Sequence, residues 1–293
     1  MNIALTGATG FVGSHILTEL VQHGHEVTAL VRDEGSANAA EALGATPVQL
    51  DLTDTAAAVR AFATADAAVH TASPGDATSS DLDSAVVDAV LEAFAGTGKA
   101  YSQIGGLWVY GSNPAITEDS PFHSPALVAW REPIEARALA AKDVRSTVVV
   151  SSVAYGDGGG GLPGALLGSP RDESGNLITV GDGGQRWSTV HVADLAAFFR
   201  AVLESESAHG YYIVGDGVNP TVTELTQAAA VAVGAPGAIS GSEQEARARF
   251  GDWFAEVLLL DQATTAEKAR TDLGWRPTHP SLEEEFRQGS YRR

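Results

Sequence analysis

The feature that most constrains the fold of this chain is a glycine pattern near its first residue. An apolar run, Ile3–Thr6, leads into Gly7-x-x-Gly10-x-x-Gly13, and a helical pattern follows at once. A strand, a glycine turn and a helix in this order are typical of a dinucleotide pyrophosphate site. Gly7 permits the tight turn, Gly10 lets the backbone approach the phosphates, and Gly13 lets the helix pack closely on the strand. Free N–H groups at the start of the helix would bind the phosphates.

Strands and helices alternate through the first half of the chain. The predicted strands are short and apolar, and they cover Ile3–Thr6, Glu26–Val31, Thr46–Leu50, Ala67–His70, Ser102–Leu107 and Thr147–Ser151. Helices are predicted between them, among others over Phe11–His23, Asp81–Phe94 and Pro133–Ala141. Apolar strands of this kind are buried on both faces of a parallel sheet. The alternation therefore predicts an α/β fold, a doubly wound parallel sheet of the Rossmann type with right-handed crossovers.

The character of the sequence changes after Tyr155, where residues 156–161 are mostly glycine. Further helices are predicted over Leu162–Leu167, Val192–Leu203, Val222–Val233 and Glu243–Phe254, with strands around Leu177–Val180 and Tyr211–Val214. We expect a dinucleotide-binding domain over residues 1–155, to which some later segments return. Residues 156–293 would mainly form a smaller C-terminal substrate-binding lobe at the carboxyl ends of the strands, where open α/β sheets bind ligands.

Composition excludes several kinds of partner. The 293 residues include no cysteine, so disulfides and cysteine-based zinc sites are impossible, and we predict no metal site. A formal net charge of -19 repels nucleic acid and anionic membranes. The sequence has no signal-peptide pattern and no apolar run of about 18 residues. We therefore expect a cytoplasmic protein that acts on a small-molecule substrate.

Residues at the ends of the predicted strands indicate which dinucleotide binds. Arg32 comes first after the second strand, and Asp33 follows it. An arginine there accommodates the 2′-phosphate of NADP, whereas an acid would bond the ribose 2′-hydroxyl of NAD. We therefore favour NADP(H), with NAD(H) as the alternative. Asp51 would either lie beside the adenine or cap the following helix. The predicted cofactor-binding residues are Gly7, Thr9, Gly10, Phe11, Val12, Gly13, Arg32, Asp51, Leu52, Thr71, Ala72 and Ser73.

Several motifs together resemble the short-chain dehydrogenase/reductase superfamily, in its extended or atypical branch of NAD-dependent epimerase/dehydratase-like proteins. They are Thr6–Gly13, Asp51-Leu52, His70–Ser73, Val109-Tyr110-Gly111, Val153–Gly156, Trp187–Leu195 and Leu273–Pro277. The resemblance covers nearly the whole chain. It implies a Rossmann fold, a nicotinamide cofactor and a possible homodimer, but it does not imply one substrate.

The chain departs from the family at the catalytic positions. The family uses a Tyr, a Lys four residues later on the same helix, and a Ser or Thr at the end of the fifth strand. In this sequence no Tyr is followed by Lys at that spacing. Trp130 and Ile134 stand where the Tyr and Lys would be, and Gly105 stands at the Ser or Thr position. The catalytic residues are therefore unknown from the sequence, and Tyr155, Trp130 and Arg131 remain candidates.

Three functions stay open. The first is an NADP(H)-dependent oxidoreductase that reduces a small or medium carbonyl, imine or conjugated substrate with a non-standard proton donor. The second is a sensor or scaffold that binds NAD(P) without catalysis, and the third is an epimerase or dehydratase with bound NAD(P). For an enzyme, we expect four aromatic side chains to line the substrate pocket, namely Trp108, Trp130, Tyr155 and Trp187.

Overall fold

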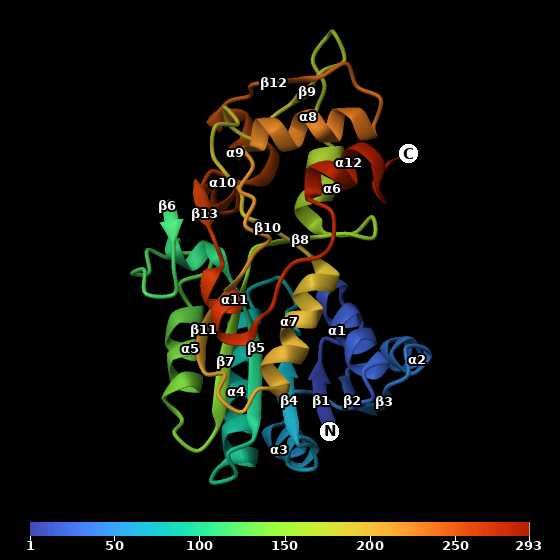
Figure 1. The fold of residues 1–293 in the computed structure, drawn as a ribbon, viewed down its shortest axis with the longest axis vertical. Coiled ribbons are helices and arrows are strands. Elements are labelled where there is room, and N and C mark those ends of the chain that lie inside the picture. Colours follow the sequence, from blue (N-terminus) through green and yellow to red (C-terminus); the bar gives the residue numbers. More distant parts are fainter. Residues whose placement is uncertain (293) are drawn as a thin grey trace.

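The computed structural model describes residues 1–292 and contains a central seven-stranded sheet with helices on both faces (Figure 1). The strands pair in parallel, in the order β11-β7-β5-β4-β1-β2-β3. In that order they span Gly210–Val214, Arg145–Ser151, Ala100–Gly106, Ala67–His70, Asn2–Thr6, Glu26–Val31 and Thr46–Gln49. The predicted doubly wound parallel sheet is confirmed.

The order of the strands opens a crevice at the middle of the sheet. From β1 the chain builds β2 and β3 on one side, and it then crosses back to place β4 on the other side of β1. Such a reversal separates the crossover helices on either side, and ligands bind outside the carboxyl ends of the two strands. The glycine turn that follows β1 therefore lies at the place where this fold binds dinucleotides.

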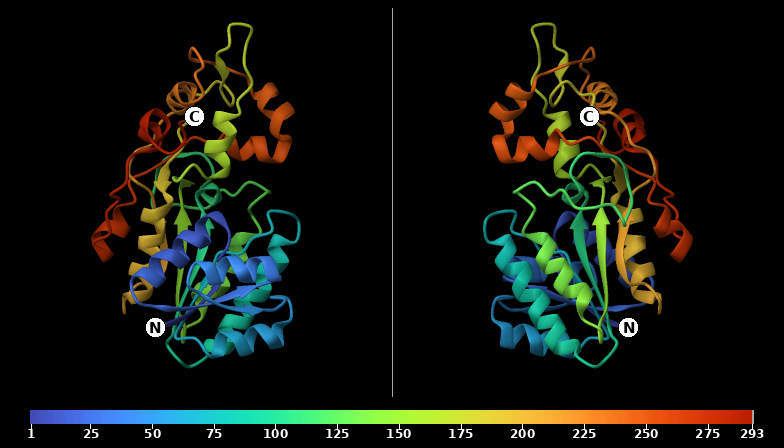
Figure 2. Two further views of the ribbon diagram at one scale, coloured as in Figure 1. Left: turned by 90° about the vertical axis from the view of Figure 1, so that its right-hand side faces the viewer. Right: turned by 90° about the vertical axis from the view of Figure 1, so that its left-hand side faces the viewer.

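Two apolar layers attach the helices to the sheet. Alternate residues of β1 point to opposite faces, so Ile3 and Leu5 belong to one layer and Ala4 to the other. The first layer is covered by α1 (Phe11–Gln22), α2 (Glu34–Ala42), α7 (Val192–Glu204) and α11 (Glu267–Leu273). The second layer is covered by α3 (Thr55–Ala63), α4 (Ser79–Phe94) and α5 (Arg131–Ala140). Figure 2 shows these two layers of helices from the side.

A second group of elements lies beyond the carboxyl ends of the strands, in the upper half of Figure 1. Its helices are α6 (Gly161–Leu167), α8 (Val222–Ala232), α9 (Glu243–Phe250), α10 (Asp252–Leu258) and α12 (Leu282–Gln288). Short parallel pairs join β8 (Val153–Tyr155) to β10 (Thr189–His191), β9 (Leu177–Ile178) to β12 (Ala238–Ile239), and β6 (Asn113–Ile116) to β13 (Gln262–Thr264). These helices share an apolar cluster of their own, separate from the two layers on the sheet.

The structure differs from the sequence predictions in one helix. The segment Glu243–Phe254, predicted as a single helix, is divided between α9 and α10 at Gly251, whose φ of 77° ends the first helix. The sheet also takes its edge strand β11, and the helix α7, from beyond residue 156.

No helix within residues 1–292 combines the length and hydropathy that a bilayer crossing requires. The His, Asp and Glu side chains of the same residues form no group of three or more that could hold a metal ion.

Candidate functional site

The glycine turn after β1 combines close packing with open space. Gly7 has a φ of +74°, and a Cβ there would lie 2.6 Å from the Ala72 nitrogen. A Cβ at Gly13 would overlap the carbonyl oxygen of Gly7, so both positions need glycine for packing. A Cβ at Gly10, by contrast, would meet only Gly7 O, at 3.4 Å. The space above Gly10 is therefore free for a phosphate at the N-terminus of α1.

A cavity of about 890 Å³ begins at this turn and runs past the carboxyl ends of β2 and β3. The predicted cofactor-binding residues that line it are Gly7, Thr9, Gly10, Arg32, Asp51, Leu52, Thr71, Ala72 and Ser73. Phe11, Val12 and Gly13 lie next to it on α1 but are not part of the lining. The sequence analysis missed Ser36, Thr78 and Asp81, which also line it. Ser36 and Asp81 lie in the first turns of α2 and α4, and Thr78 is the N-cap of α4, so including the first turn of each helix after a strand would have found them.

The far end of the cavity has an exposed arginine and a carboxylate that is already engaged. Asp33 caps α2 by accepting from Ser36 N at 2.7 Å, and this hydrogen bond lowers the pKa of the Asp33 carboxyl. The Arg32 side chain is 86% exposed and donates from Nε to Asp33 at 3.1 Å. Its other two nitrogens have no partner among residues 1–292. Arg32 and Ser36 both line the cavity, whereas Asp33 does not.

Asp51 does not cap the helix that follows it. Its carboxylate accepts from the backbone N–H and the hydroxyl of Thr53, at 2.9 and 2.7 Å, and the backbone bond lowers the pKa of Asp51. The cap of α3 is Asp54, which accepts from Ala57 N at 3.1 Å. The helix-capping alternative is therefore wrong, because a three-residue turn separates Asp51 from the helix. A place beside the adenine stays a prediction for Asp51.

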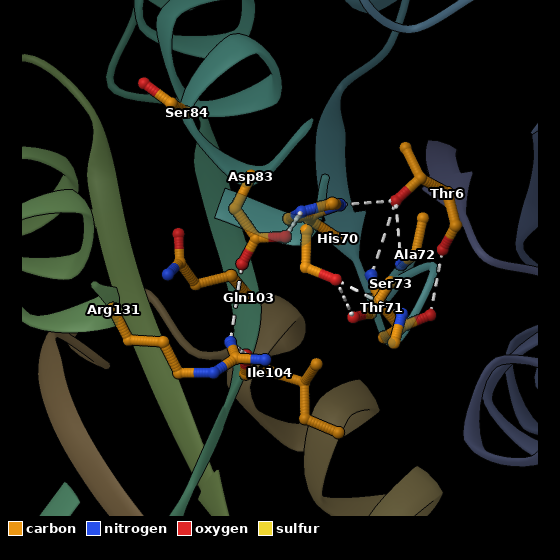
Figure 3. Close-up of polar contacts among 12 residues, drawn as sticks. Thr6, His70, Thr71, Ala72, Ser73, Asp83, Ser84, Gln103, Ile104 and Arg131 are labelled. Carbon is orange, nitrogen blue, oxygen red and sulfur yellow. Dashed lines mark hydrogen bonds and ion pairs between the residues drawn. The ribbon is translucent and has the colours of Figure 1, made fainter. Parts of the chain in front are cut away.

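A continuous chain of buried polar side chains crosses the carboxyl edge of the sheet (Figure 3). Thr6 Oγ1 accepts from the backbone N–H groups of Thr71 and Ala72, at 3.3 and 3.4 Å. Its own proton is then donated to His70 Nδ1, at 2.6 Å. Nδ1 is then the acceptor, and Nε2 donates to Asp83 at 3.2 Å. His70 is thus a satisfied structural histidine between β1 and α4.

Arg131 completes this chain at the start of α5. Its Nη1 donates to the second oxygen of Asp83 at 3.3 Å and to Ile104 O at 3.4 Å. The guanidinium also lies over the Trp130 ring, 4.4 Å from its centroid. The side chain is 18% exposed, so its charge is partly desolvated. The structure therefore fixes a permanent positive charge at the carboxyl end of β5.

The positions predicted to correspond to the family's catalytic residues hold side chains that are engaged in packing or in local hydrogen bonds. Trp130 donates its indole N–H to Leu127 O at 3.0 Å, and Ile134 is buried in the apolar layer under α5. A Cβ at Gly105 would lie 2.9 Å from the Val148 side chain and 3.1 Å from the Glu135 carboxylate of α5, so this position is closely packed. The next residue, Gly106, has open space where its Cβ would be. The open position at the end of β5 is thus Gly106 rather than Gly105.

Glu135 is a titratable residue that the sequence analysis did not single out. It lies on the buried face of α5, and neither carboxylate oxygen has a hydrogen-bond partner among residues 1–292. Burial raises the pKa of this carboxyl to about 7, against the lowering effect of the Arg131 charge. The burial of the Glu135 carboxylate results from the packing of α5 against the sheet, and the helical periodicity of the sequence does not indicate it.

Of the four aromatic residues predicted for the substrate pocket, Tyr155, Trp187 and Trp108 pack in the upper apolar cluster, whereas Trp130 packs against the layer under α5. Tyr155 is fully buried and donates its hydroxyl to Pro280 O at 2.8 Å, and burial raises its pKa above the ordinary value. Trp187 is also buried and donates to Leu258 O at 3.1 Å. Trp108 and Trp130 remain partly exposed, in separate places after β5 and before α5. The hydroxyl of Tyr155 is thus engaged in the interior of the upper cluster.

Comparisons with known proteins agree with this geometry. The family model described as "NAD dependent epimerase/dehydratase family" matches residues 3–215. The uncharacterized protein C2A9.02 of Schizosaccharomyces pombe is 29% identical over 99% of this chain and 100% of its own. The 2-alkyl-3-oxoalkanoate reductase of Stenotrophomonas maltophilia is 27% identical over 98% of each chain. The crystal structure of human epimerase family protein SDR39U1 with NADPH has the same fold, with a TM-score of 0.77, 23% identity and 99% of each chain covered.

Proposed function

The chain belongs to the NAD dependent epimerase/dehydratase family, and we propose that it is an NADP(H)-dependent oxidoreductase. The observation that carries this proposal is the cavity that joins the open Gly10 turn to the exposed Arg32. One end has open space for a diphosphate, and the other offers a guanidinium whose two outer nitrogens have no partner among residues 1–292. A dinucleotide with a phosphate on its adenosine ribose fits both ends.

The choice of NADP(H) over NAD(H) depends on which group the Asp33 carboxylate binds. Its carboxylate caps α2 and so is turned away from the cavity, where it would be needed to bond a ribose 2′-hydroxyl. Arg32, which lines the cavity, is instead placed to bind a 2′-phosphate through its two outer nitrogens. The human relative crystallised with NADPH supports the same choice.

We assign Arg131 to the substrate oxygen. A nicotinamide held at this site would supply a hydride for the carbon of a carbonyl, imine or conjugated double bond. Arg131 is held by Asp83 and Ile104 through one nitrogen, so its remaining donors are free to stabilise negative charge on the substrate. An arginine does not release its proton at neutral pH, so water supplies the proton that completes the reduction.

A substrate screen with an arginine variant tests this function. The parent should oxidise NADPH in the presence of some small ketones, imines or enones, as followed by the loss of nicotinamide absorbance. Arg131→Gln should lower kcat on the best substrate by about a hundredfold, the usual effect of losing an oxyanion donor. Arg137→Gln is the matched control, because Arg137 also joins α5 to α4 but bonds Ser84 and Asp88 instead.

The results of this screen distinguish between the three functions that the sequence left open. Equal kcat values for the parent and Arg131→Gln would remove Arg131 from the mechanism. Tight NADPH binding without turnover on any compound class would favour the non-catalytic sensor. Retention of the oxidised cofactor through turnover, with no net change in absorbance, would favour an epimerase or dehydratase.

A further inference from the structure

The glycine-rich loop between β8 and α6, residues 156–160, is held by two side chains from the far end of the chain. Gly156 N–H donates to the Tyr291 hydroxyl at 2.7 Å, and Gly158 N–H donates to the Ser290 hydroxyl oxygen at 2.8 Å. The Tyr291 hydroxyl donates in turn to the carbonyl oxygen of Gly159. Three backbone groups of a five-residue loop are thus bonded by two consecutive side chains.

The conformation of this loop needs such restraint. Gly156, Asp157, Gly158 and Gly160 all have positive φ angles, and for Asp157 the value is 49°. Glycine loses more conformational freedom than any other residue when it is ordered, and a non-glycine residue rarely adopts this region. The bonds to Ser290 and Tyr291 therefore bear directly on whether the loop keeps this one shape.

The two anchoring side chains are themselves firmly placed. The Tyr291 ring is 4% exposed and packs against Phe286 of α12, with the ring centroids 5.1 Å apart. Burial raises the pKa of Tyr291 to about 12, so its hydroxyl keeps the proton that it donates. Ser290 bonds one oxygen of Glu285 through its N–H at 2.9 Å and its hydroxyl at 2.6 Å. Figure 1 shows α12 and the C-terminus beside α6, on the same side of β8 as this loop.

The opposite side of the loop lies on the start of α1. Gly159 lies so close to the Phe11 ring that a Cβ would overlap it. Asp157 bonds His15 Nε2 at 2.9 Å, one turn further along the helix. Phe11 directly follows Gly10, above which the phosphate space opens. The loop therefore sits at the N-terminus of α1, next to the glycine turn.

The loop 156–160 lies where the nicotinamide half of a dinucleotide would be expected in this fold. The cavity described above covers the ends of β2 and β3, on the adenosine side, and residues 156–160 do not line it. The loop follows β8, which comes directly after β7, and β7 lies on the β4 side of β1 in the sheet. A dinucleotide in this fold crosses the sheet edge at the switch point between β1 and β4. From the glycine turn, its nicotinamide half would therefore extend toward the loop.

We propose that Ser290 and Tyr291 are positioning residues that fix the loop 156–160 over the start of α1 and so shape the nicotinamide half of the cofactor site. The inference rests on the proposed function, because it requires a bound dinucleotide. Neither residue lines the cavity described above. Their effect acts through the loop, which without them would have to be ordered each time the cofactor binds.

Tyr291→Phe tests this arrangement, because it keeps the buried ring and removes only the hydroxyl. Affinity is measured by calorimetry for two probes, NADPH and adenosine 2′,5′-bisphosphate, which lacks the nicotinamide half. We expect the Kd for NADPH to rise about tenfold, as the loss of buried hydrogen bonds implies. The Kd for the fragment should stay unchanged, and amide hydrogen exchange should become faster in residues 156–160.

Tyr212→Phe is the matched control, because Tyr212 is a buried tyrosine of β11 whose hydroxyl bonds Asp272 at 3.2 Å. It should alter neither affinity nor loop exchange. Ser290→Ala provides a second variant, which decides the question should Tyr291→Phe fail to fold.

Three results would overturn the inference. One is unchanged NADPH affinity in both variants, and another is an equal loss for NADPH and the fragment, which indicates general damage. Unchanged exchange in the loop would also contradict it. A parent protein that binds no dinucleotide refutes the proposed function and this inference together. If the parent binds NADPH, but no more tightly than its variants do, the inference is refuted and the proposed function is not.

Discussion

At the scale of single residues, the same residue type serves different purposes along one short motif. Gly13 is required because a Cβ would overlap Gly7 O, while Gly10 faces open space. Carboxylates differ in the same way. Asp83 is buried but accepts from two donors, whereas the two oxygens of Glu135 have no partner among residues 1–292. Environment, rather than residue type, therefore decides which of these side chains is available for chemistry.

We predict that alanine substitutions at Gly13 and Gly10 affect different properties, namely the stability of the fold and the affinity for NADPH. Gly13→Ala should lower the free energy of unfolding by about 1–3 kcal/mol without any ligand, because the core there is already full. Gly10→Ala should leave the fold stable and raise the Kd for NADPH more than tenfold, because the methyl group enters the phosphate space. Urea unfolding and calorimetry on both variants check this. A stable Gly13→Ala, or a Gly10→Ala that binds like the parent, would contradict the packing described.

Glu135 should make stability depend on pH. Its pKa of about 7 lies above the ordinary 4.5, so its neutral form favours the folded state. This contribution is complete below pH 4.5 and is lost as pH rises through about 7. Relative to Glu135→Gln, the parent should lose about 2 kcal/mol of stability between pH 5 and pH 8, measured by urea unfolding. The exposed Glu41→Gln serves as control, and parallel pH profiles for all three proteins would refute the assignment.

At the scale of elements, strand ends and helix starts build the site. The loops after β1, β2, β3 and β4 all contribute to the cavity, because parallel strands bring their carboxyl ends to one edge. Helix breaks matter equally. Gly251 separates α9 from α10, and sequence periodicity alone continues through this position because apolar residues lie on both sides.

We predict that Gly251→Ala destabilises the protein by about 1 kcal/mol, since its φ of 77° is unfavourable for any residue with a Cβ. Gly164→Ala is the control, because Gly164 lies within α6 and a Cβ there would meet no atom within 4 Å. That change should be neutral or stabilising by up to about 1 kcal/mol. Urea midpoints of the two variants decide the matter. Equal midpoints would show that α9 and α10 can join into one helix.

At the scale of the whole molecule, the last residues of the chain act beside the first helix. The segment after α11 returns past α7, where Asp194 accepts from Thr278 and His279, and it ends at the glycine-rich loop. Cofactor binding is therefore expected to stabilise the complete chain rather than the sheet domain alone.

A thermal shift measures this coupling and also tests the choice of cofactor. NADPH at a hundred times its Kd should stabilise the parent by about 2.7 kcal/mol, which raises Tm by about 5 °C. In Arg32→Ala, the same NADPH concentration should give a much smaller shift, because the 2′-phosphate loses its cation. The shift with NADH should be alike in the two proteins. An equal loss with both dinucleotides would argue against the phosphate role of Arg32.

The fold and much of the cofactor site could be predicted from sequence because their signals are local. The Gly7–Gly13 spacing, the apolar runs of the strands and the small residues after β4 are each readable within a few positions. The alternation of strand and helix then leaves few ways to form the sheet. The absence of a Tyr followed four residues later by Lys is likewise readable from the sequence alone.

Tertiary structure alone decided what those local signals do not contain. It buried Glu135, turned Tyr155 into the interior, joined His70 to Arg131 through Asp83, and brought Tyr291 to the loop at Gly156. Each of these outcomes depends on groups far apart in the chain, and on which side of a packed layer a side chain falls. Burial and hydrogen-bond partners are properties of that packing, so no short stretch of sequence specifies them.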